Sequence, residues 1–236
     1  MIDFDGVVNC RDVGGLALET GGVTRHGVLF RSETPQFMSE TDVKRAREQF
    51  GIGLVIDLRG KKFQGTDLGG SGPLASEGRG VNIDFMGLAG GMDVVDQTPE
   101  GFLIALLDCG AKGLEVFLEH FVSTDQGVLV HCHTGKDRTG FVIAMTLAMA
   151  GVRDEDIIAD YAMSGPVFDM MMAKLAANGM PVPPGAPAYA HHPPSVESIT
   201  QMFRLLRTRW TSPHEWALQQ GIKPDLIASA RARLVA

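Results

Sequence analysis

A segment of ten residues, His131 to Gly140 with the sequence HCHTGKDRTG, combines a thiol, a glycine and cationic side chains. It follows an apolar run typical of a strand and precedes a run typical of a helix. A loop that enters a helix presents unpaired N–H groups and the positive end of the helix dipole, which together bind anions. Gly135 lets these amides converge, and the guanidinium of Arg138 can bind two phosphate oxygens at once. The segment therefore predicts a phosphate-binding loop.

Cys132 lies at the start of this loop, where the amides, the helix dipole and Arg138 all favour its thiolate. Such surroundings lower a cysteine pKa from ~8.5 to about 3.5–7.5. A thiolate beneath a bound phosphate is a nucleophile directed at phosphorus. The predicted reaction is attack by sulfur, formation of a phosphocysteine intermediate and its hydrolysis, with no metal or other cofactor.

The other residues of the segment are expected to support the same site. Lys136 adds a point charge that favours polyanionic substrates. Thr139 is expected to hydrogen-bond the sulfur and ease its departure, and His131 to orient the loop or the thiolate. The expected phosphate-binding residues, acting chiefly through backbone amides, are His133, Thr134, Gly135, Lys136 and Thr139.

The chain around the loop indicates an α/β architecture. Gly53–Arg59 and Gly127–His131 are short runs rich in β-branched residues, typical of strands buried on both faces of a parallel sheet. Helical spacing follows over Gly101–Val122 and Thr139–Ala150, and the C-terminal third is also helical. We expect a central, mostly parallel sheet flanked by helices.

The organisation along the chain predicts a single domain over residues 1–236, with helices of residues 195–236 packed on it. Residues 60–91 carry many glycines and little periodicity. This stretch, with the helix that follows to about residue 110, is a candidate for a mobile lid over the pocket.

The composition limits the partners and the cellular compartment that are expected for this protein. Of the 236 residues 44% are hydrophobic, and the formal net charge of −7 argues against a nucleic-acid partner. The three cysteines are widely spaced and odd in number, which favours a reducing cytoplasm over a disulfide framework. The most apolar stretch, Phe141–Val152, is too short to span a bilayer, so no stable membrane insertion is expected.

The loop resembles the signature of the protein tyrosine phosphatase superfamily, which is His-Cys, five residues, Arg and then Ser or Thr. Its Gly-Lys-Asp-Arg-Thr-Gly form is similar to that of bacterial and fungal tyrosine and dual-specificity phosphatases that also act on phosphoinositides. The resemblance covers nearly the whole chain, since it extends to further blocks at Asn9-x-Arg11-Asp12-x-Gly14-Gly15, Leu29-x-Arg31-Ser32, Asp57-Leu58-Arg59 and Asp160-Tyr161-x-x-Ser164.

This resemblance implies a phosphatase-type fold, a phosphorylated protein or phosphoinositide as substrate, and a site-supporting role for Arg11 and Asp12. An exposed ion pair is the alternative for these two residues. Asp57 and Arg59 follow a predicted parallel strand, where ligand sites of α/β proteins gather, although a structural salt bridge is equally expected. One departure from the family is Gly60-Lys61-Lys62-Phe63, where a glutamate is usual, so substrate choice is expected to depend on the segment after Arg59.

The leaving group needs a proton donor. In the group that the chain resembles, the aspartate within the signature loop is implicated, so Asp137 is the first candidate for the general acid. Asp84, Asp93 and Asp96 lie upstream and are the reserves. Two other functions are compatible with a cysteine loop: a phosphate-binding module with little turnover, and sulfur transfer of the rhodanese type. The sequence leaves the oligomeric state open.

Overall fold

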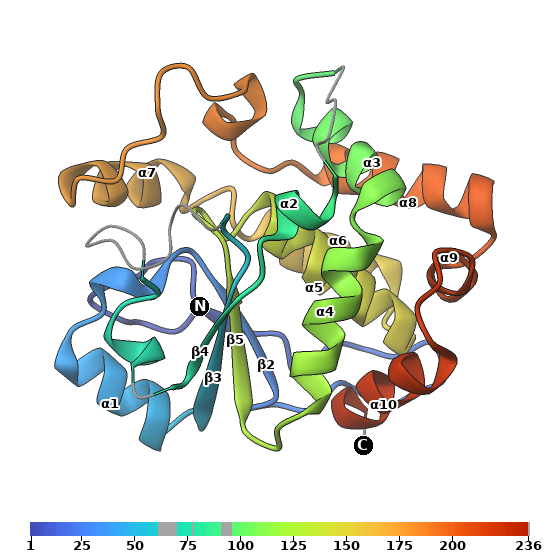
Figure 1. The fold of residues 1–236 in the computed structure, drawn as a ribbon, viewed down its shortest axis with the longest axis horizontal. Helices are drawn as coiled ribbons and strands as arrows, with labels where there is room; N and C mark the ends of the chain where they lie inside the picture. The colour runs from blue at the N-terminus through green and yellow to red at the C-terminus, as the bar shows by residue number, and fades with distance from the viewer. Residues whose placement is uncertain (61–69, 77, 91–95, 236) are drawn as a thin grey trace.

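The computed structural model describes residues 1–60, 70–76, 78–90 and 96–235 (Figure 1). The candidate lid therefore falls partly on residues 61–69, which lie outside the described part of the chain, and so does Asp93. No helix of the described residues is both long and apolar enough to cross a membrane.

The core of the fold is a sheet of five strands. In spatial order these are β1 (Arg11–Asp12), β2 (Leu29–Ser32), β5 (Gly127–His131), β3 (Ile52–Asp57) and β4 (Gly80–Asn82). β1 is antiparallel to β2, and the other neighbours are parallel. The predicted α/β fold with a mostly parallel sheet is confirmed.

The register of the three central strands aligns their carboxyl ends. His131 at the end of β5 pairs with Ser32 at the end of β2 and with Asp57 at the end of β3. The segments that continue from these three strands therefore leave the sheet side by side. Ligand sites of open parallel sheets form at this edge.

Side chains alternate between two cores, as the period of a strand requires. Val128 and Val130 of β5 pack with the larger group of helices, whereas Leu129 packs with Phe30 and Val55 on the opposite face. In Figure 1, α1 (Glu40–Glu48) covers this second face, and α4 (Ala111–Val122) lies on the first.

The first face is also covered by α2 (Phe85–Leu88), α3 (Pro99–Cys109), α5 (Asp137–Ala150) and α10 (Pro224–Leu234). The expected single run of helix over Gly101–Val122 is wrong in one respect, because it divides at Gly110. A Cβ at Gly110 would lie 2.6 Å from Leu106 O and 2.8 Å from the Phe141 ring, so the chain turns where only glycine fits.

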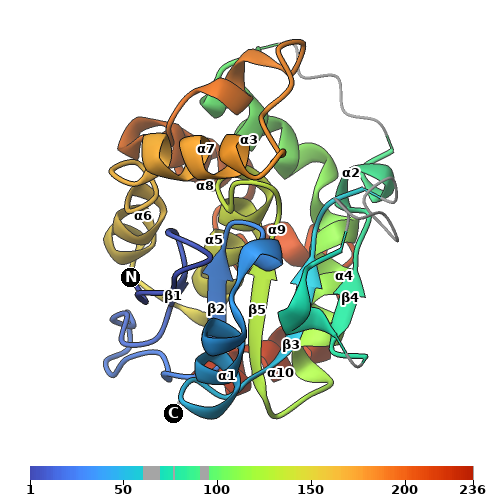
Figure 2. The same cartoon turned by 90° about the vertical axis from the view of Figure 1, so that its left-hand side faces the viewer.

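α5 is the central helix of the larger core, and nearly all of its side chains are buried. The remaining helices surround it: α6 (Asp154–Ala162), α7 (Phe168–Ala177), α8 (Val196–Trp210) and α9 (Pro213–Gln219). The fully buried Trp216 of α9 packs edge-on against Phe141 of α5 and donates its indole N–H to Leu107 O at 3.0 Å. α7 lies across the carboxyl ends of the strands (Figure 2).

Candidate active site

The predicted phosphate-binding segment connects the end of β5 to the start of α5. We call residues 132–138 the cysteine loop; they include the first turn of α5, which begins at Asp137. The loop lies at the edge where β2, β3 and β5 end, as the predicted strand-loop-helix arrangement requires. The N-terminal end of a long buried helix thus faces the loop, with its dipole favouring an anion there.

The backbone carbonyls of residues 132 to 135 all have hydrogen-bond donors. In order, these donors are His131 Nδ1 at 2.9 Å, Thr34 N at 3.0 Å, Asn9 Nδ2 at 3.2 Å and Arg31 Nη2 at 2.8 Å. The C=O and N–H groups of one trans peptide point in opposite directions. Carbonyls held by surrounding donors therefore turn the N–H groups of residues 133–136 to the other side, where they can bind an oxyanion.

Gly135 is required at its position by both conformation and space. Its φ of 66° lies in the left-handed region. A Cβ there would lie 2.2 Å from Ser32 O, which belongs to the neighbouring strand end. The close approach of the loop to β2 is thus possible only with glycine.

Cys132 lies at the first position of the loop, and its residue is 2% exposed. It packs in the larger core, whereas Cys10 packs in the core on the other face of the sheet. All three cysteines are free thiols, and burial raises the pKa of Cys10 far above its usual range. The loop position, next to a helix N-terminus and Arg138, distinguishes Cys132 as the nucleophile candidate.

Arg138 lies in the first turn of α5 and is the partly exposed cation of the loop. Its Nη1 donates to Leu58 O, just beyond the end of β3, at 3.3 Å. This bond leaves other N–H groups of the guanidinium for a ligand. Thr139 is fully buried, and its Oγ1 has no hydrogen-bond partner among the described residues. The expected bond from Thr139 to the Cys132 sulfur remains a prediction.

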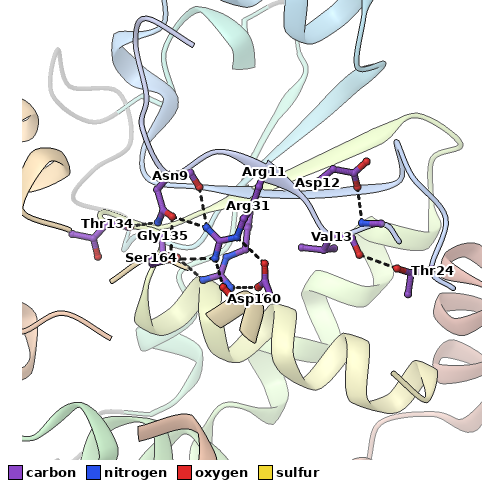
Figure 3. A network of polar contacts seen from close by, with 11 residues as sticks. Asn9, Arg11, Asp12, Val13, Thr24, Arg31, Thr134, Gly135, Asp160 and Ser164 are labelled. Carbon is purple, nitrogen blue, oxygen red and sulfur yellow. Dashed lines mark hydrogen bonds and ion pairs between the residues drawn. The ribbon is translucent and has the colours of Figure 1, made fainter. Parts of the chain in front are cut away.

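A buried ion cluster supports the loop from one side (Figure 3). The Asp160 carboxylate of α6 binds Arg11 Nε at 2.7 Å and Arg31 Nη1 at 2.5 Å. Arg11 also bonds Asn9 Oδ1 at 2.6 Å, and Arg31 reaches the loop through Gly135 O. Burial alone would raise the pKa of Asp160, but the two guanidinium groups bring it below its usual range. The exposed ion pair considered for Arg11 is therefore wrong, since Arg11 is a buried support of the loop.

Asp12 has a different position from Arg11. Its carboxylate accepts from Gly14 N at 2.8 Å and Gly27 N at 2.8 Å, and it lies 3.2 Å from His26 Nδ1. Figure 3 shows it apart from the ion cluster. The expectation that Asp12 supports the site is corrected: it stabilises a turn, because an aspartate side chain readily accepts from backbone N–H groups two residues on.

A second buried network supports the loop from the β3 side. Arg59 and Asp57 form a side-chain pair with Nε–Oδ1 at 2.9 Å and Nη2–Oδ2 at 2.8 Å. His131 lies 3.9 Å from the Asp57 carboxylate, and Ser71 Oγ lies 2.9 Å from its Nε2. Burial lowers the pKa of His131, which favours the neutral imidazole. Asp57, Arg59 and His131 are thus brought together at the end of β5, where the cysteine loop begins.

Of the next two loop residues, His133 is half-buried and Thr134 is buried. The pKa of His133 is lowered to about 4, first by burial and then by the charges of Arg138 and Arg59, so the imidazole is neutral at pH 7. Thr134 is buried, with a residue exposure of 6%. Their predicted contribution through backbone amides agrees with the inward direction of the loop N–H groups.

The ammonium group of Lys136 does not have the position expected of a point charge that binds phosphate. Its side chain is fully buried, and its Nζ donates to Tyr189 O at 2.6 Å and His192 O at 2.7 Å. The structure therefore corrects this prediction for the ammonium group, because two carbonyls of the proline-rich segment bind it. The backbone N–H of Lys136 remains part of the loop.

Asp137 is the acidic residue of the cysteine loop and the first candidate for the general acid. Its residue is 8% exposed, and its Oδ1 lies 3.4 Å from Lys136 Nζ. Burial raises the pKa of Asp137, partly offset by the charges of Lys136 and Arg138. A raised carboxyl pKa is the property that a general acid needs near neutral pH.

The described reserve acids have other partners. Asp84 caps α2 and accepts from Gly87 N at 3.1 Å. The carboxylate of Asp96 is exposed and accepts from Thr98 N at 3.0 Å, before α3. Both carboxylates bind backbone N–H groups near helix starts, so each has a structural role there.

Replacement of Asp137 by asparagine is expected to lower kcat for a poor leaving group, such as phenol, by about 10²–10³-fold. With a good leaving group, such as p-nitrophenol, the loss should stay below about tenfold, because that group leaves without a proton. In the wild type, kcat on phenyl phosphate should fall as pH rises through the raised pKa of Asp137. The Asp137→Asn variant should lack this fall, and equal losses on both substrates would exclude Asp137 as the acid.

Several supporting residues were not selected from the sequence as part of the site. Asn9, Arg31 and Asp160 were only members of family blocks, and Glu33 and Ser71 were not singled out. The Glu33 carboxylate accepts from Val8 N at 2.6 Å and Asn9 N at 2.9 Å. These bonds fix the backbone of Asn9, whose side chain binds the loop at Thr134 O. The available signal was a charged residue, Arg31 or Glu33, within or directly after an apolar strand, since buried charges need partners.

The comparisons with known proteins agree with this geometry. Residues 2–236 match the model of the tyrosine phosphatase family. A Cupriavidus necator protein named as a tyrosine-protein phosphatase is 33% identical over 170 residues, which cover 67% of this chain and 60% of that protein. The matched region thus spans less than two thirds of the relative's length.

Two shorter matches are with a triple specificity protein phosphatase of Mycobacterium tuberculosis and a tyrosine-protein phosphatase of Nostoc commune. The first is 43% identical over 49 residues, 21% of this chain and 18% of the relative. The second is 42% identical over 50 residues, 21% of this chain and 17% of the relative. Because the family model matches nearly its whole length, the chain belongs to the tyrosine phosphatase family.

Proposed function

We propose that this protein hydrolyses phosphate monoesters, with phosphotyrosine in proteins as the main substrate, by nucleophilic attack of Cys132. The observation that carries the proposal is the cysteine loop, whose four carbonyls are held by surrounding donors while Cys132 and Arg138 lie at its two ends. Family membership supports the same reaction.

In the proposed reaction, the loop amides and Arg138 bind the phosphate oxygens and the Cys132 thiolate attacks phosphorus. The P–O bond to the alcohol or phenol breaks as the S–P bond forms, and Asp137 gives its proton to the leaving oxygen. Water then attacks the phosphocysteine, Asp137 takes up the water proton, and the thiolate leaves. Catalysis rests on positioning and on stabilisation of charge spread over the equatorial oxygens.

The substrate range beyond phosphotyrosine is a finer part of the proposal. We extend the proposal to phosphoserine and phosphothreonine peptides and to phosphoinositides. The relative named as a triple specificity protein phosphatase supports a range wider than one substrate class. The buried ammonium of Lys136 argues for single phosphate groups over polyphosphorylated ones. We place the enzyme in the cytoplasm, where free thiols such as the three in this chain stay reduced.

The test is hydrolysis of p-nitrophenyl phosphate and of a phosphotyrosine peptide by the purified chain, with EDTA present and with vanadate as inhibitor. We expect turnover of both substrates that EDTA leaves intact and vanadate blocks. Phosphate or vanadate binding without turnover would show a binding module instead. Formation of thiocyanate from thiosulfate and cyanide, without phosphate release, would show a sulfurtransferase.

A further inference from the structure

The buried ammonium of Lys136 joins the cysteine loop to the proline-rich segment that follows α7. Its Nζ lies 2.6 Å from Tyr189 O, 2.7 Å from His192 O and 3.4 Å from Asp137 Oδ1. An ammonium group has three N–H donors; two are hydrogen-bonded to these carbonyls, and the Asp137 carboxylate adds an ion pair. The Phe168 ring of α7 lies 5.4 Å from Nζ, at the distance of a cation–π contact.

The contacts of Lys136 fix the position of the proline-rich segment. Burial of an ammonium group is costly unless it is paired and hydrogen-bonded, and its two hydrogen-bond acceptors here are carbonyls of the short helix Ala188–His191 and of the residue after it. The bonds therefore fix this segment against the start of α5. In Figures 1 and 2 the segment, in orange, lies beyond α7 at the carboxyl ends of the strands, next to α3.

Tyr189 is held at both its backbone and its ring. Its carbonyl binds Lys136, and its ring packs on Phe102 of α3, with centroids 4.2 Å apart and planes at 33°. Tyr189 is only partly buried, so part of its surface remains accessible. A half-buried aromatic ring fixed in this way presents a rigid apolar surface.

The phenol of Tyr189 lies in the electric field of the catalytic groups. Burial raises its pKa first, the charge of Asp137 raises it further, and the charge of Arg138 lowers it. The geometry agrees, because the same ammonium group of Lys136 binds the Tyr189 carbonyl at 2.6 Å and lies 3.4 Å from the Asp137 carboxylate. A substrate whose phosphate occupies the loop would carry its leaving group past this ring.

We propose that Lys136 is a positioning residue that holds Tyr189 as an aromatic wall beside the cysteine loop, and that this wall selects aryl over alkyl phosphate esters. The inference rests on the proposed phosphatase function and deepens it by naming the side chain that distinguishes phosphotyrosine. A flat ring of the substrate gains stacking on Tyr189, whereas the short side chain of phosphoserine does not reach a comparable contact.

The test compares kcat/KM for a phosphotyrosine peptide and for a phosphoserine peptide of the same sequence. Tyr189→Ala is expected to lower the ratio of the two values by about five- to tenfold. Tyr189→Phe keeps the ring and should retain the ratio within about twofold. Lys136→Met, which keeps the length of the side chain and removes its charge, should lower the ratio as Tyr189→Ala does.

The double variant Lys136→Met/Tyr189→Ala separates positioning from direct contact. If the lysine acts through the tyrosine, the two effects on the ratio overlap, and the double variant matches Tyr189→Ala within about twofold. Inhibition by vanadate, which has no ring, should change by less than about threefold in Tyr189→Ala, because the wall is proposed to contact the leaving group and not the anion.

Three results would overturn the inference. They are an unchanged ratio in Tyr189→Ala, fully multiplicative losses of the ratio in the double variant, and a loss of vanadate inhibition in Lys136→Met with the ratio intact. Thermal unfolding of each variant shows whether it is folded. If Lys136→Met does not fold, the Tyr189→Ala and Tyr189→Phe pair still decides whether the wall exists. If the wild type hydrolyses neither peptide, the proposed function fails first, which is a different outcome from an unchanged ratio.

Discussion

Replacement of Cys132 by serine is expected to lower the hydrolysis of p-nitrophenyl phosphate by about a thousandfold or more. The loop amides, the α5 dipole and Arg138 can stabilise a thiolate, but a serine hydroxyl ionises far less readily than a thiol. The expected phosphocysteine intermediate should be visible by mass spectrometry of the wild type quenched during turnover. The serine variant should not form it.

The matched control is Cys109→Ser. Cys109 is partly buried in α3, and its thiol bonds Ala105 O at 3.2 Å, a contact that a serine hydroxyl also makes. Its activity should stay within about threefold of the wild type, because it lies outside the loop. Full activity in Cys132→Ser, or an equal loss in both variants, would contradict the assignment of the nucleophile.

Replacement of Asp160 by asparagine is expected to lower the free energy of unfolding by about 3–5 kcal/mol. The carboxylate is the shared partner of Arg11 and Arg31, and an amide of the same shape leaves two buried cations facing each other. The two guanidinium groups already affect each other in the wild type. The pKa of Arg11 falls to about 10, first through burial and then through the charge of Arg31. Urea unfolding at pH 7 measures the loss. We also expect kcat/KM to fall by about tenfold or more, because Arg31 holds the Gly135 carbonyl.

Asp154→Asn is the control for this prediction. Asp154 pairs with Arg207 at 2.7 Å, but both side chains are partly exposed, so its loss should cost less than about 1 kcal/mol. The two variants should also differ with pH. The pKa of Asp160 is lowered on folding, so its contribution is complete above the unfolded carboxyl value of ~3.9 and is lost as pH falls through the folded pKa. Equal destabilisation by both substitutions would contradict a buried cluster.

The fold was predictable where local pattern and tertiary packing agree. The β-branched runs that became β3 and β5 are buried on both faces, so their apolar character was not ambiguous. The division of the predicted helix at Gly110 was not predictable, because it depends on contact with Phe141, which lies on another helix. β1 has only two residues, too few to show a period, and its pairing with β2 depends on tertiary context.

The positions of the site residues along the chain could be predicted from the sequence, but the directions of some of their side chains could not. Cys132, Gly135 and Arg138 take positions set by the strand, the loop and the first helical turn, which spacing along the chain determines. Lys136 was assigned from its charge within the loop and Asp12 from the family resemblance, but the direction of a side chain depends on its partners in the fold. The two carbonyls that bind Lys136 lie more than fifty residues away, in a proline-rich segment without a regular pattern.

The hydrogen bonds that hold the loop carbonyls have a consequence for the speed of binding. Their donors belong to the folded scaffold: the backbone of Thr34, the side chain of Asn9 and the guanidinium of Arg31. The conformational entropy of the loop is therefore lost when the chain folds and is not lost again when an oxyanion binds. An anion meets a surface already formed for it, so association should proceed in one kinetic step whose rate rises linearly with anion concentration, without a slower ordering phase.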